Sequence, residues 1–207
     1  ELGQVMPHWD RTLDAVIATH PQEDHVAGLA EAIGRVRAAA VYENGRTNVT
    51  TAFAVFENRA SARQALQQGS SFQLDGVLFE VLWPPAGYTT DDLNNTSLVI
   101  RVTYGERTFL FTADSEEGVH AELLRSSQLH ADVLKVTHHG SQTTEPWFFD
   151  AVHPAVAVIS AGAGNVYGHP HAQTLQALEG VRTYRTDESG RVTVRTDGAT
   201  LRVSSER

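Results

Sequence analysis

The sequence predicts a layered α/β fold, in which helices cover the faces of more than one β-sheet. Three observations support this class. A strand, loop, helix and strand open the chain, two hairpins occupy its middle, and strands alternate with helices after residue 131. Of the 207 residues, 41% are hydrophobic and 20% are charged, which suits a compact domain with a sizeable core. We therefore expect residues 1–207 to form one domain.

The first unit follows from hydrophobic periodicity. Residues 13–20 form an apolar run that ends in polar residues, which is typical of a buried strand followed by a loop over 20–25. Apolar residues then recur at helical spacing and predict a helix over 25–37, and residues 38–45 follow as a second strand. Residues 50–67 begin with β-favouring residues, but their apolar positions fit one helical face, so we predict a helix there.

The remaining elements are marked by turn and capping residues. Asp75-Gly76 and Gly105-Glu106 suit the tight turns of two hairpins, over 72–85 and 97–114. A helix over 115–126 follows, with Ser115 as a plausible N-cap. Further strands are predicted over 131–140 and 155–162, further helices over 145–152 and 171–180, and a meander of three short strands over 181–204.

Composition excludes several classes of function. The formal charge of -9 argues against a general electrostatic grip on nucleic acid, which relies on clustered Lys and Arg. The chain has no cysteine, so disulfides, thiolate zinc sites and cysteine nucleophiles are excluded. Neither a bilayer-length apolar run nor a signal-peptide pattern occurs, so we expect a soluble piece, and a membrane-bound parent is compatible with that.

Metal-binding residue types follow three of the predicted strands. They are His20, Asp24 and His25, then Asp114, then His138 and His139. Sites in open α/β folds collect at the carboxyl ends of strands, and histidine nitrogen with carboxylate oxygen is a typical donor set for divalent metals. Taken singly, each residue has a plainer role, since a lone histidine is usually a surface residue and Asp114 suits a helix cap. Their coincidence at strand ends favours a shared metal site.

These residues carry a resemblance to a known family. THPQEDH resembles the H-x-H-x-D-H loop of the metallo-β-lactamase superfamily. The later order of NNTSLVIRV, FTAD, LKVTHHGS and YGHPH is similar to the C-terminal nuclease domain of ComEC-type DNA-internalisation (competence) proteins. The resemblance implies a metallo-β-lactamase-like αββα sandwich. Family members usually begin with a glycine-rich D-V-G-Q-G-D segment, whereas this sequence begins at ELGQVMPHWD, so we expect the first β-hairpin to be missing.

The resemblance also implies a set of metal ligands. The residues that match are His20, Asp24, His25, Asp114 and His138, with His139 as the less favoured alternative to His138. Gln22 stands at the second loop histidine, and Asn94 or Asn95 takes the place of the middle histidine. A glutamine amide binds transition metals more weakly than imidazole does, so we expect one divalent ion, Mn²⁺ or Zn²⁺, rather than two.

The implied chemistry is metal-assisted hydrolysis, for which we interpret Asp24, Asp114 and His169 as catalytic. His169 would donate a hydrogen bond to phosphate or a proton to the leaving oxygen, and its plainer role is that of a turn residue before Pro170. Ser141 would orient phosphate or cap its turn. The histidines at positions 8, 120, 130 and 153 have no spacing partners and are predicted to lie at the surface.

The leading functional hypothesis is the nuclease domain of a ComEC-like DNA uptake protein. By resemblance, it would degrade the non-transforming DNA strand at the extracytoplasmic face of the cell membrane, joined to a transmembrane channel domain of the same parent chain. One alternative is a free-standing hydrolase of small phosphodiesters or esters, which the acidic composition supports. Another is a non-catalytic module whose metal site has decayed, which Gln22 suggests.

Overall fold

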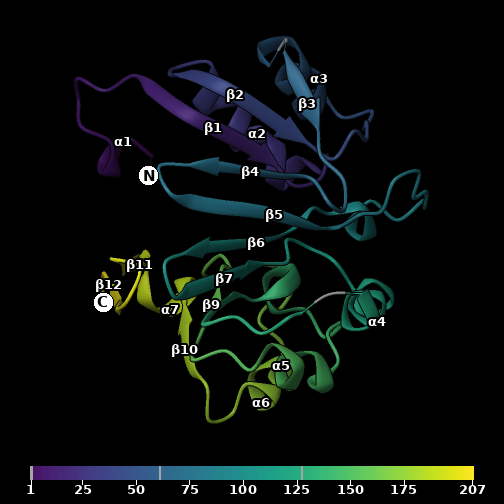
Figure 1. The fold of residues 1–207 in the computed structure, drawn as a ribbon, viewed down its shortest axis with the longest axis vertical. Coiled ribbons are helices and arrows are strands. Elements are labelled where there is room, and N and C mark those ends of the chain that lie inside the picture. The colour runs from purple at the N-terminus through teal and green to yellow at the C-terminus, as the bar shows by residue number, and fades with distance from the viewer. Residues whose placement is uncertain (1, 61, 127) are drawn as a thin grey trace.

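The chain folds into four layers, in the order helices, sheet, sheet, helices (Figure 1). The computed structural model describes residues 2–60, 62–126 and 128–207. Within them the strands form a three-stranded sheet, a seven-stranded sheet and a two-stranded hairpin. The predicted layered α/β class is therefore confirmed.

The smaller sheet is parallel and has the order β1-β2-β3. Its elements, with the helices of this half, are α1 (Leu2–Val5), β1 (Thr12–Ala18), α2 (Glu23–Ile33), β2 (Arg37–Glu43), α3 (Thr51–Arg59) and β3 (Arg63–Ala65). One face is covered by α2 and α3, whose Val26, Phe53 and Phe56 are buried against Val41. Within the described residues no strand pairs with the outer edge of β1.

The larger sheet has the order β10-β9-β8-β7-β6-β5-β4, parallel from β7 to β10 and antiparallel from β7 to β4. Its strands are β4 (Ser71–Leu74), β5 (Val77–Trp83), β6 (Val99–Tyr104), β7 (Arg107–Phe111), β8 (Val133–Lys135), β9 (Val156–Ile159) and β10 (Arg182–Arg185). The helices of this half are η1 (Asn94–Thr96), α4 (Glu117–Ser126), η2 (Thr137–Gly140), α5 (Pro146–Val152), α6 (Ala172–Ala177) and α7 (Thr186–Ser189). The largest apolar cluster lies under α4 and α5, around Leu123, Leu134 and Phe148.

The two sheets face one another through a third apolar cluster. Leu66, Val81 and Ile100 are buried in it, and the Tyr42 ring stacks on Phe72 with 4.6 Å between centroids. At one end the Leu98 N–H donates to the Thr19 carbonyl over 2.9 Å. This bond ties the loop after β1 to the start of β6, so the two sheets are held together beside the predicted metal ligands.

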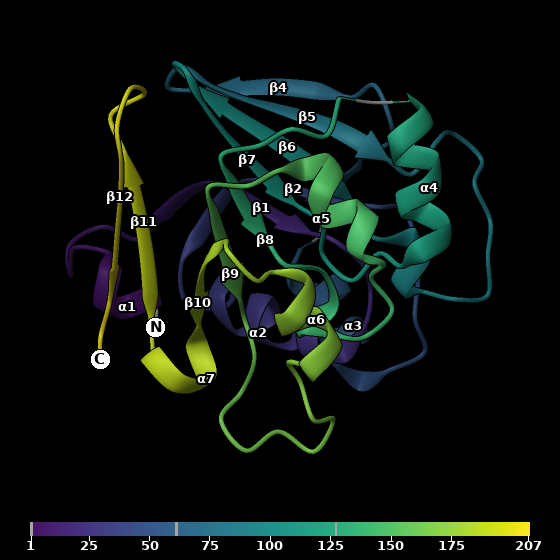
Figure 2. The same cartoon turned by 90° about the horizontal axis from the view of Figure 1, so that it is seen from below.

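The last two strands form a hairpin that stands at the flank of the molecule (Figure 2). They are β11 (Val192–Thr196) and β12 (Leu201–Ser205). The hairpin tip rests on the turn between β6 and β7, where the Glu106 N–H donates to the Gly198 carbonyl over 2.7 Å. A Cβ on Gly105 would lie 2.5 Å from that carbonyl oxygen, so this contact requires glycine. The predicted terminal meander is wrong in one respect, because β10 pairs with β9 in the larger sheet.

Three predicted elements have different bounds in the structure. The helix predicted over 25–37 begins at Glu23 and ends at Ile33, so it includes two of the expected ligands. The helix predicted over 50–67 ends at Arg59, because Leu66 belongs to the cluster between the sheets rather than to the one under α3. Ser115 does not directly precede a helix, since α4 begins at Glu117, and its hydroxyl donates to the Thr112 carbonyl instead.

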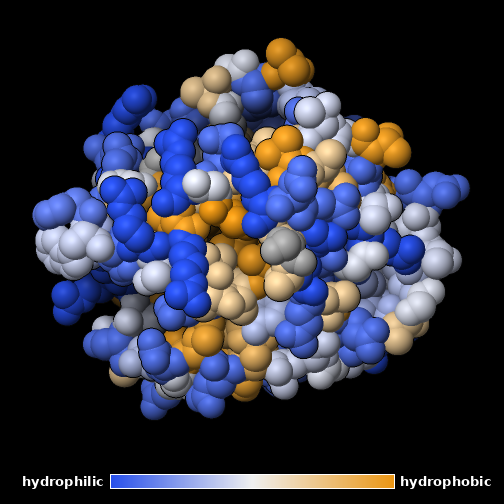
Figure 3. Space-filling view, turned by 90° about the horizontal axis from the view of Figure 1, so that it is seen from above, coloured by the Kyte–Doolittle hydropathy of each residue, from blue (hydrophilic) through white to orange (hydrophobic). Residues whose placement is uncertain are grey.

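The outer surface carries both polar and apolar side chains. Seen from above the α3 end, apolar side chains lie between polar ones (Figure 3). Exposed apolar residues of this region include Val49, before α3, and Val55 within it. Among the described residues, no helix has both the length and the apolar character that a bilayer crossing requires.

Candidate metal centre

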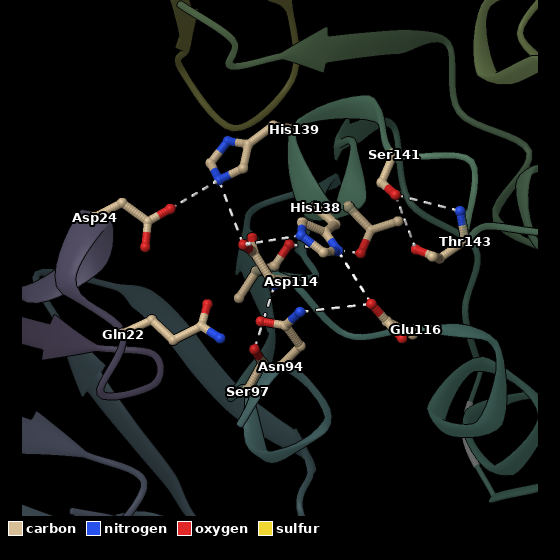
Figure 4. A network of polar contacts seen from close by, with 12 residues as sticks. Gln22, Asp24, Asn94, Ser97, Asp114, Glu116, His138, His139, Ser141 and Thr143 are labelled. Carbon is tan, nitrogen blue, oxygen red and sulfur yellow. Dashed lines mark hydrogen bonds and ion pairs between the residues drawn. The ribbon is translucent and has the colours of Figure 1, made fainter. Parts of the chain in front are cut away.

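Four side chains converge where β1, β7 and β8 end. Asp24, His25, Asp114 and His139 each offer a ligand atom, and all four atoms lie within 4.8 Å of one another. The Asp114 Oδ2 atom is 3.1 Å from His25 Nε2 and 3.3 Å from His139 Nε2. The His139 Nε2 atom is also 3.6 Å from Asp24 Oδ2 (Figure 4). Two carboxylates and two imidazoles at this separation form a suitable donor set for one divalent transition metal.

Asp24 and His25 are positioned by the start of α2. The N–H group of His25 donates to the Gln22 carbonyl over 3.1 Å, so the helix begins inside the sequence loop that was expected to stay irregular. The His25 Nδ1 atom is 3.5 Å from the Thr19 hydroxyl, which leaves Nε2 facing Asp114. The first helical turn thus presents an exposed carboxylate and a half-buried imidazole to the same point.

Asp114 follows β7 and is 1% exposed. Its backbone is held by the Ser97 hydroxyl, which accepts from the Asp114 N–H over 3.3 Å, and the preceding Ala113 has a left-handed φ of 45°. Burial alone would raise the pKa of this carboxyl, but the neighbouring imidazoles of His139 and His25 hold the pKa far below its usual range. Asp114 is therefore an anion, and a buried anion requires cations around it.

His139 has one ring nitrogen bound to the backbone and one left facing the carboxylates. Its Nδ1–H donates to the Ser160 carbonyl over 2.7 Å. The Nε2 atom is buried without a hydrogen-bond partner of acceptable geometry, although Asp114 and Asp24 lie close to it. The side chain of Asp114, then that of Asp24, raises the pKa of His139 to about 9. A histidine whose outer nitrogen is fixed by a carbonyl and whose inner nitrogen needs a cation fits a metal ligand.

The paired histidines occupy strained backbone. His138 and His139 have φ values of 43° and 54°, in the left-handed region that side chains rarely adopt. Gly140 follows with φ 85°, and a Cβ there would lie 2.6 Å from the Pro170 Cβ. Such strain costs of order 1–3 kcal/mol per residue and is found at functional sites. It is this turn that directs His139 toward Asp114.

His138 points to a different carboxylate. Its Nδ1 atom is 3.2 Å from Glu116 Oε1, while its Nε2 atom is 4.0 Å from Asp114 Oδ2 (Figure 4). The geometry therefore favours His139 over His138 as the last ligand, opposite to the order expected from the sequence. The physical reason is the left-handed turn at His138 and His139. The sequence indicates only that the two histidines follow a strand, not that the backbone turns there.

His20 lies beside this cluster but outside it. Its Nδ1 atom is 3.2 Å from the Ser97 hydroxyl, and its Nε2 atom is 3.2 Å from Gln22 Oε1. Burial, followed by the neighbouring His25, lowers the pKa of His20 to about 4, so this ring is neutral at pH 7. The Thr19 hydroxyl also lies 3.2 Å from Nδ1, so two hydroxyl groups are within donating distance of this nitrogen. We propose the tautomer in which Nδ1 accepts from a hydroxyl group and Nε2–H donates to Gln22 Oε1, which leaves Nε2 without a free lone pair for a metal.

The cluster opens into a cleft of about 550 Å³. Its lining includes Gln22, Asn94, His138, Tyr167 and His169 besides three of the four clustered residues. The His169 ring lies 5.7 Å from His138 and stacks on Tyr167 at 5.8 Å. Burial, then the charge of His138, lowers the pKa of His169, which keeps this imidazole neutral near pH 7.

The other predicted residues have structural contacts. Asn94 lines the cleft and donates to Glu116 over 3.5 Å, whereas Asn95 donates to Asp92 and accepts from the Glu116 N–H. The Ser141 hydroxyl is 3.3 Å from that of Thr143 and thus closes its own turn. Neither Asn95 nor Ser141 lines the cleft.

Sequence reasoning missed three residues of this site. Lys135, the only lysine, has its Nζ atom 3.8 Å from Asp114 Oδ1. Glu116 faces His138, and Tyr167 covers His169. Lys135 could have been identified from the sequence, because a lysine inside an apolar strand needs an acidic partner when it is buried. The other two lie on loops whose course the sequence does not specify.

Comparison with known proteins gives a consistent result. A family model described as "Metallo-beta-lactamase superfamily" matches residues 10–188. The chain is 32% identical over 194 residues to "ComE operon protein 3" of Bacillus subtilis, a match that covers 89% of this chain and 25% of that protein. It is 27% identical to "Recombination protein 2" of Haemophilus influenzae, covering 92% of this chain and 24% of that protein. The chain thus spans about a quarter of the length of these relatives.

Solved structures of low sequence identity share the fold. A putative metal-dependent hydrolase from Parabacteroides distasonis has a TM-score of 0.55 at 13% identity, over 86% of this chain and 78% of that one. The metallo-beta-lactamase fold protein YhfI from Bacillus subtilis has a TM-score of 0.53 at 14% identity, over 84% and 74%. CmlA, a diiron β-hydroxylase from Streptomyces venezuelae, has a TM-score of 0.58 at 14% identity, over 85% and 44%. These likenesses concern the fold alone.

Proposed function

Because the chain belongs to the metallo-β-lactamase superfamily, whose members are generally metal-dependent hydrolases, we propose that it hydrolyses phosphodiesters with one divalent ion. The observation that carries this is the His139 Nε2 atom, which is buried and faces two carboxylates while its other nitrogen is fixed by Ser160. The ion would be held by Asp24, His25, Asp114 and His139.

A bound divalent ion supplies Lewis acidity and lowers the pKa of a water molecule toward neutrality. The chain's own residues supply the rest of the chemistry. The carboxylates of Asp24 and Asp114 accept hydrogen bonds from the attacking water and orient it. His169 is neutral near pH 7 because its pKa is lowered, so its N–H donates a hydrogen bond to a phosphate oxygen rather than a proton to the leaving group. The left-handed backbone of His138 and His139 directs the His139 ring toward Asp114.

Similarity to ComE operon protein 3 and Recombination protein 2 supports the narrower proposal of a nuclease domain in a DNA uptake protein. The substrate would be the strand that is not taken up, cut at the extracytoplasmic face of the cell membrane. The partner would be a transmembrane channel domain of the same parent chain. The alternative of small phosphodiesters rests on the acidic composition, and a comparison of the two substrates decides between them.

The test is incubation of the protein with end-labelled single-stranded DNA and with a small chromogenic phosphodiester, in Mn²⁺ and in Zn²⁺. We expect cleavage of both substrates, abolished in Asp114→Asn. Cleavage of the small diester alone would favour the alternative substrate class. If neither substrate is cut with either metal, while Gln22→His cuts both, the present sequence is an impaired variant and the proposal fails for it.

A further inference from the structure

The arginines of this acidic chain gather at its carboxyl end. Residues 182–207 contain six arginines and four acidic residues, whereas residues 1–181 contain ten basic and 21 acidic residues. The basic segment comprises β10, α7 and the hairpin β11–β12 at the flank of the molecule (Figure 2). A polyanion approaching the protein is therefore repelled by most of the chain and attracted to this segment.

Two of these arginines lie directly opposite one another. Arg195 of β11 and Arg202 of β12 are cross-strand partners, and both are exposed. Like charges in this position destabilise a hairpin. Among the described residues neither arginine has an acidic partner, in contrast to Arg185 and Arg191, which pair with Asp187 and Glu206. Two guanidinium groups are thus free to bind an anion from outside.

A groove connects this hairpin to the metal centre. It has a volume of about 520 Å³, and its lining includes His139, Ser160, Gly162, Arg191 and Glu206. Arg191 directly precedes β11 and its carbonyl still accepts from the Glu206 N–H, so by strand alternation it projects from the same face of the hairpin as Arg195. Four residues of strand extend about 13 Å. The groove and the hairpin face therefore form one path from the clustered ligands to the arginine pair.

We infer that Arg195 and Arg202 bind the phosphodiester backbone of a single-stranded nucleic acid whose scissile phosphate lies at the metal centre. The position of the scissile phosphate rests on the proposed function, whereas binding of the nucleic acid at the arginine pair does not. Guanidinium groups bind phosphate in a bidentate manner and also stack on unpaired bases, which suits a flexible single strand. The Thr193 and Ser204 hydroxyls, opposite one another on the same face, offer further hydrogen bonds along the path.

The test compares two double variants of equal charge. The hairpin variant, Arg195→Gln with Arg202→Gln, removes the arginine pair. The control variant, Arg35→Gln with Arg125→Gln, removes two other exposed arginines, of which Arg125 lies on α4 and Arg35 follows α2. Binding of a fluorescent single-stranded DNA is measured by anisotropy in EDTA, so that no turnover occurs. We expect the hairpin variant to raise Kd about 10-fold and to reduce the salt dependence of log Kd by about 1.4, and the control to change Kd less than about twofold. Equal effects of the two variants would overturn the inference.

A second measurement separates this inference from the proposed function. In Mn²⁺ the ratio of DNA cleavage to small-diester cleavage should fall about 10-fold in the hairpin variant at low DNA concentration. If the wild type cleaves neither substrate but binds DNA through Arg195 and Arg202, the proposed function fails and the inferred binding surface is supported. If the variant cuts DNA with an unchanged KM, the surface inference fails and the function stands. Hairpin-dependent binding to phosphatidylglycerol vesicles, with DNA binding unchanged, would assign the pair to lipid and overturn the inference.

Discussion

His139 belongs to the buried cluster around Asp114 and His20 lies beside it, and the two residues differ in the contacts of their ring nitrogens. His139 donates outward to the Ser160 carbonyl, which leaves its inner nitrogen facing two carboxylates. His20 Nδ1 lies beside the Ser97 and Thr19 hydroxyls and its Nε2 beside the Gln22 amide, so in the proposed tautomer neither nitrogen is left for a cation. The two pKa values are shifted in opposite directions: burial, followed by the charge of His25, lowers the pKa of His20 to about 4, and the Asp114 and Asp24 side chains raise the pKa of His139 to about 9.

The difference shows that a histidine can act as a metal ligand only if its hydrogen bonds leave one ring nitrogen available. The Gln22 amide accepts a hydrogen bond from His20 Nε2, so no metal is required there. The Ser160 carbonyl binds His139 Nδ1, so its Nε2 faces two carboxylates and a cation is required between them. On this reasoning we propose that the centre holds one ion. Four predictions test the region: three concern its metal ligands, and one concerns a buried histidine beside it.

The largest effect is expected from the carboxylate at the centre of the cluster. Asp114→Asn removes the anion that faces both His25 and His139, so Mn²⁺ and Zn²⁺ affinity should fall by at least about 100-fold. Titration calorimetry measures this. The matched control is Asp14→Asn, an exposed aspartate of β1, which should leave affinity unchanged. Undiminished binding in Asp114→Asn would place the ion elsewhere.

The next change separates the paired histidines. His139→Ala should weaken metal binding about 100-fold, because it removes the nitrogen that faces Asp24 and Asp114. His138→Ala removes a ring whose nearest carboxylate is that of Glu116, and should weaken binding less than about 10-fold. Calorimetry on both variants, with circular dichroism as the folding control, gives the comparison. The reverse order of effects would restore the expectation drawn from the sequence.

A third prediction concerns the loop that carries Asp114. His120 is fully buried, lies over the Phe148 ring and donates to the Ser115 hydroxyl over 3.2 Å. Burial lowers its pKa to about 4, while the unfolded chain protonates near 6.5. The unfolded state therefore binds more protons between these values, and the stability contributed by neutral His120 is present above pH 6.5 and lost as pH falls toward 4.

Between pH 7 and pH 5 this loss amounts to about 2 kcal/mol in the free energy of unfolding. Urea unfolding in EDTA at the two pH values measures it, and His20, with a similarly lowered pKa, adds a loss of the same sign. His120→Gln should reduce the difference between the two pH values, whatever it does to stability at pH 7. His139 has the opposite sign, since its raised pKa contributes stability below pH 6.5 that is lost as pH rises through about 9. An unchanged pH dependence in His120→Gln would contradict the assignment.

Much of this arrangement follows from the sequence, and the exceptions have physical causes. The strand ends near His20, Asp114 and His138 are readable because short apolar runs give way to polar residues there. The sequence does not decide between His138 and His139, because their orientation depends on two consecutive left-handed residues, which hydrophobic periodicity does not reveal. His120 was predicted at the surface and is buried, since its position on the inner face of α4 becomes evident only when α5 packs against it.

The prediction that tests the contrast most directly has the smallest expected effect. Gln22→His replaces the amide that meets His20 Nε2 with an imidazole able to share a cation with it. The number of bound ions should rise from one to two, measured by calorimetry and by elemental analysis of dialysed protein. Phosphodiester hydrolysis should rise about fivefold, as a second ion stabilises charge on the leaving oxygen. Gln22→Asn keeps a neutral amide and should change neither quantity. Two ions bound to the wild type would contradict this prediction. A second cation would then have displaced the hydrogen bond between Gln22 and His20, so Gln22 would not prevent metal binding at His20.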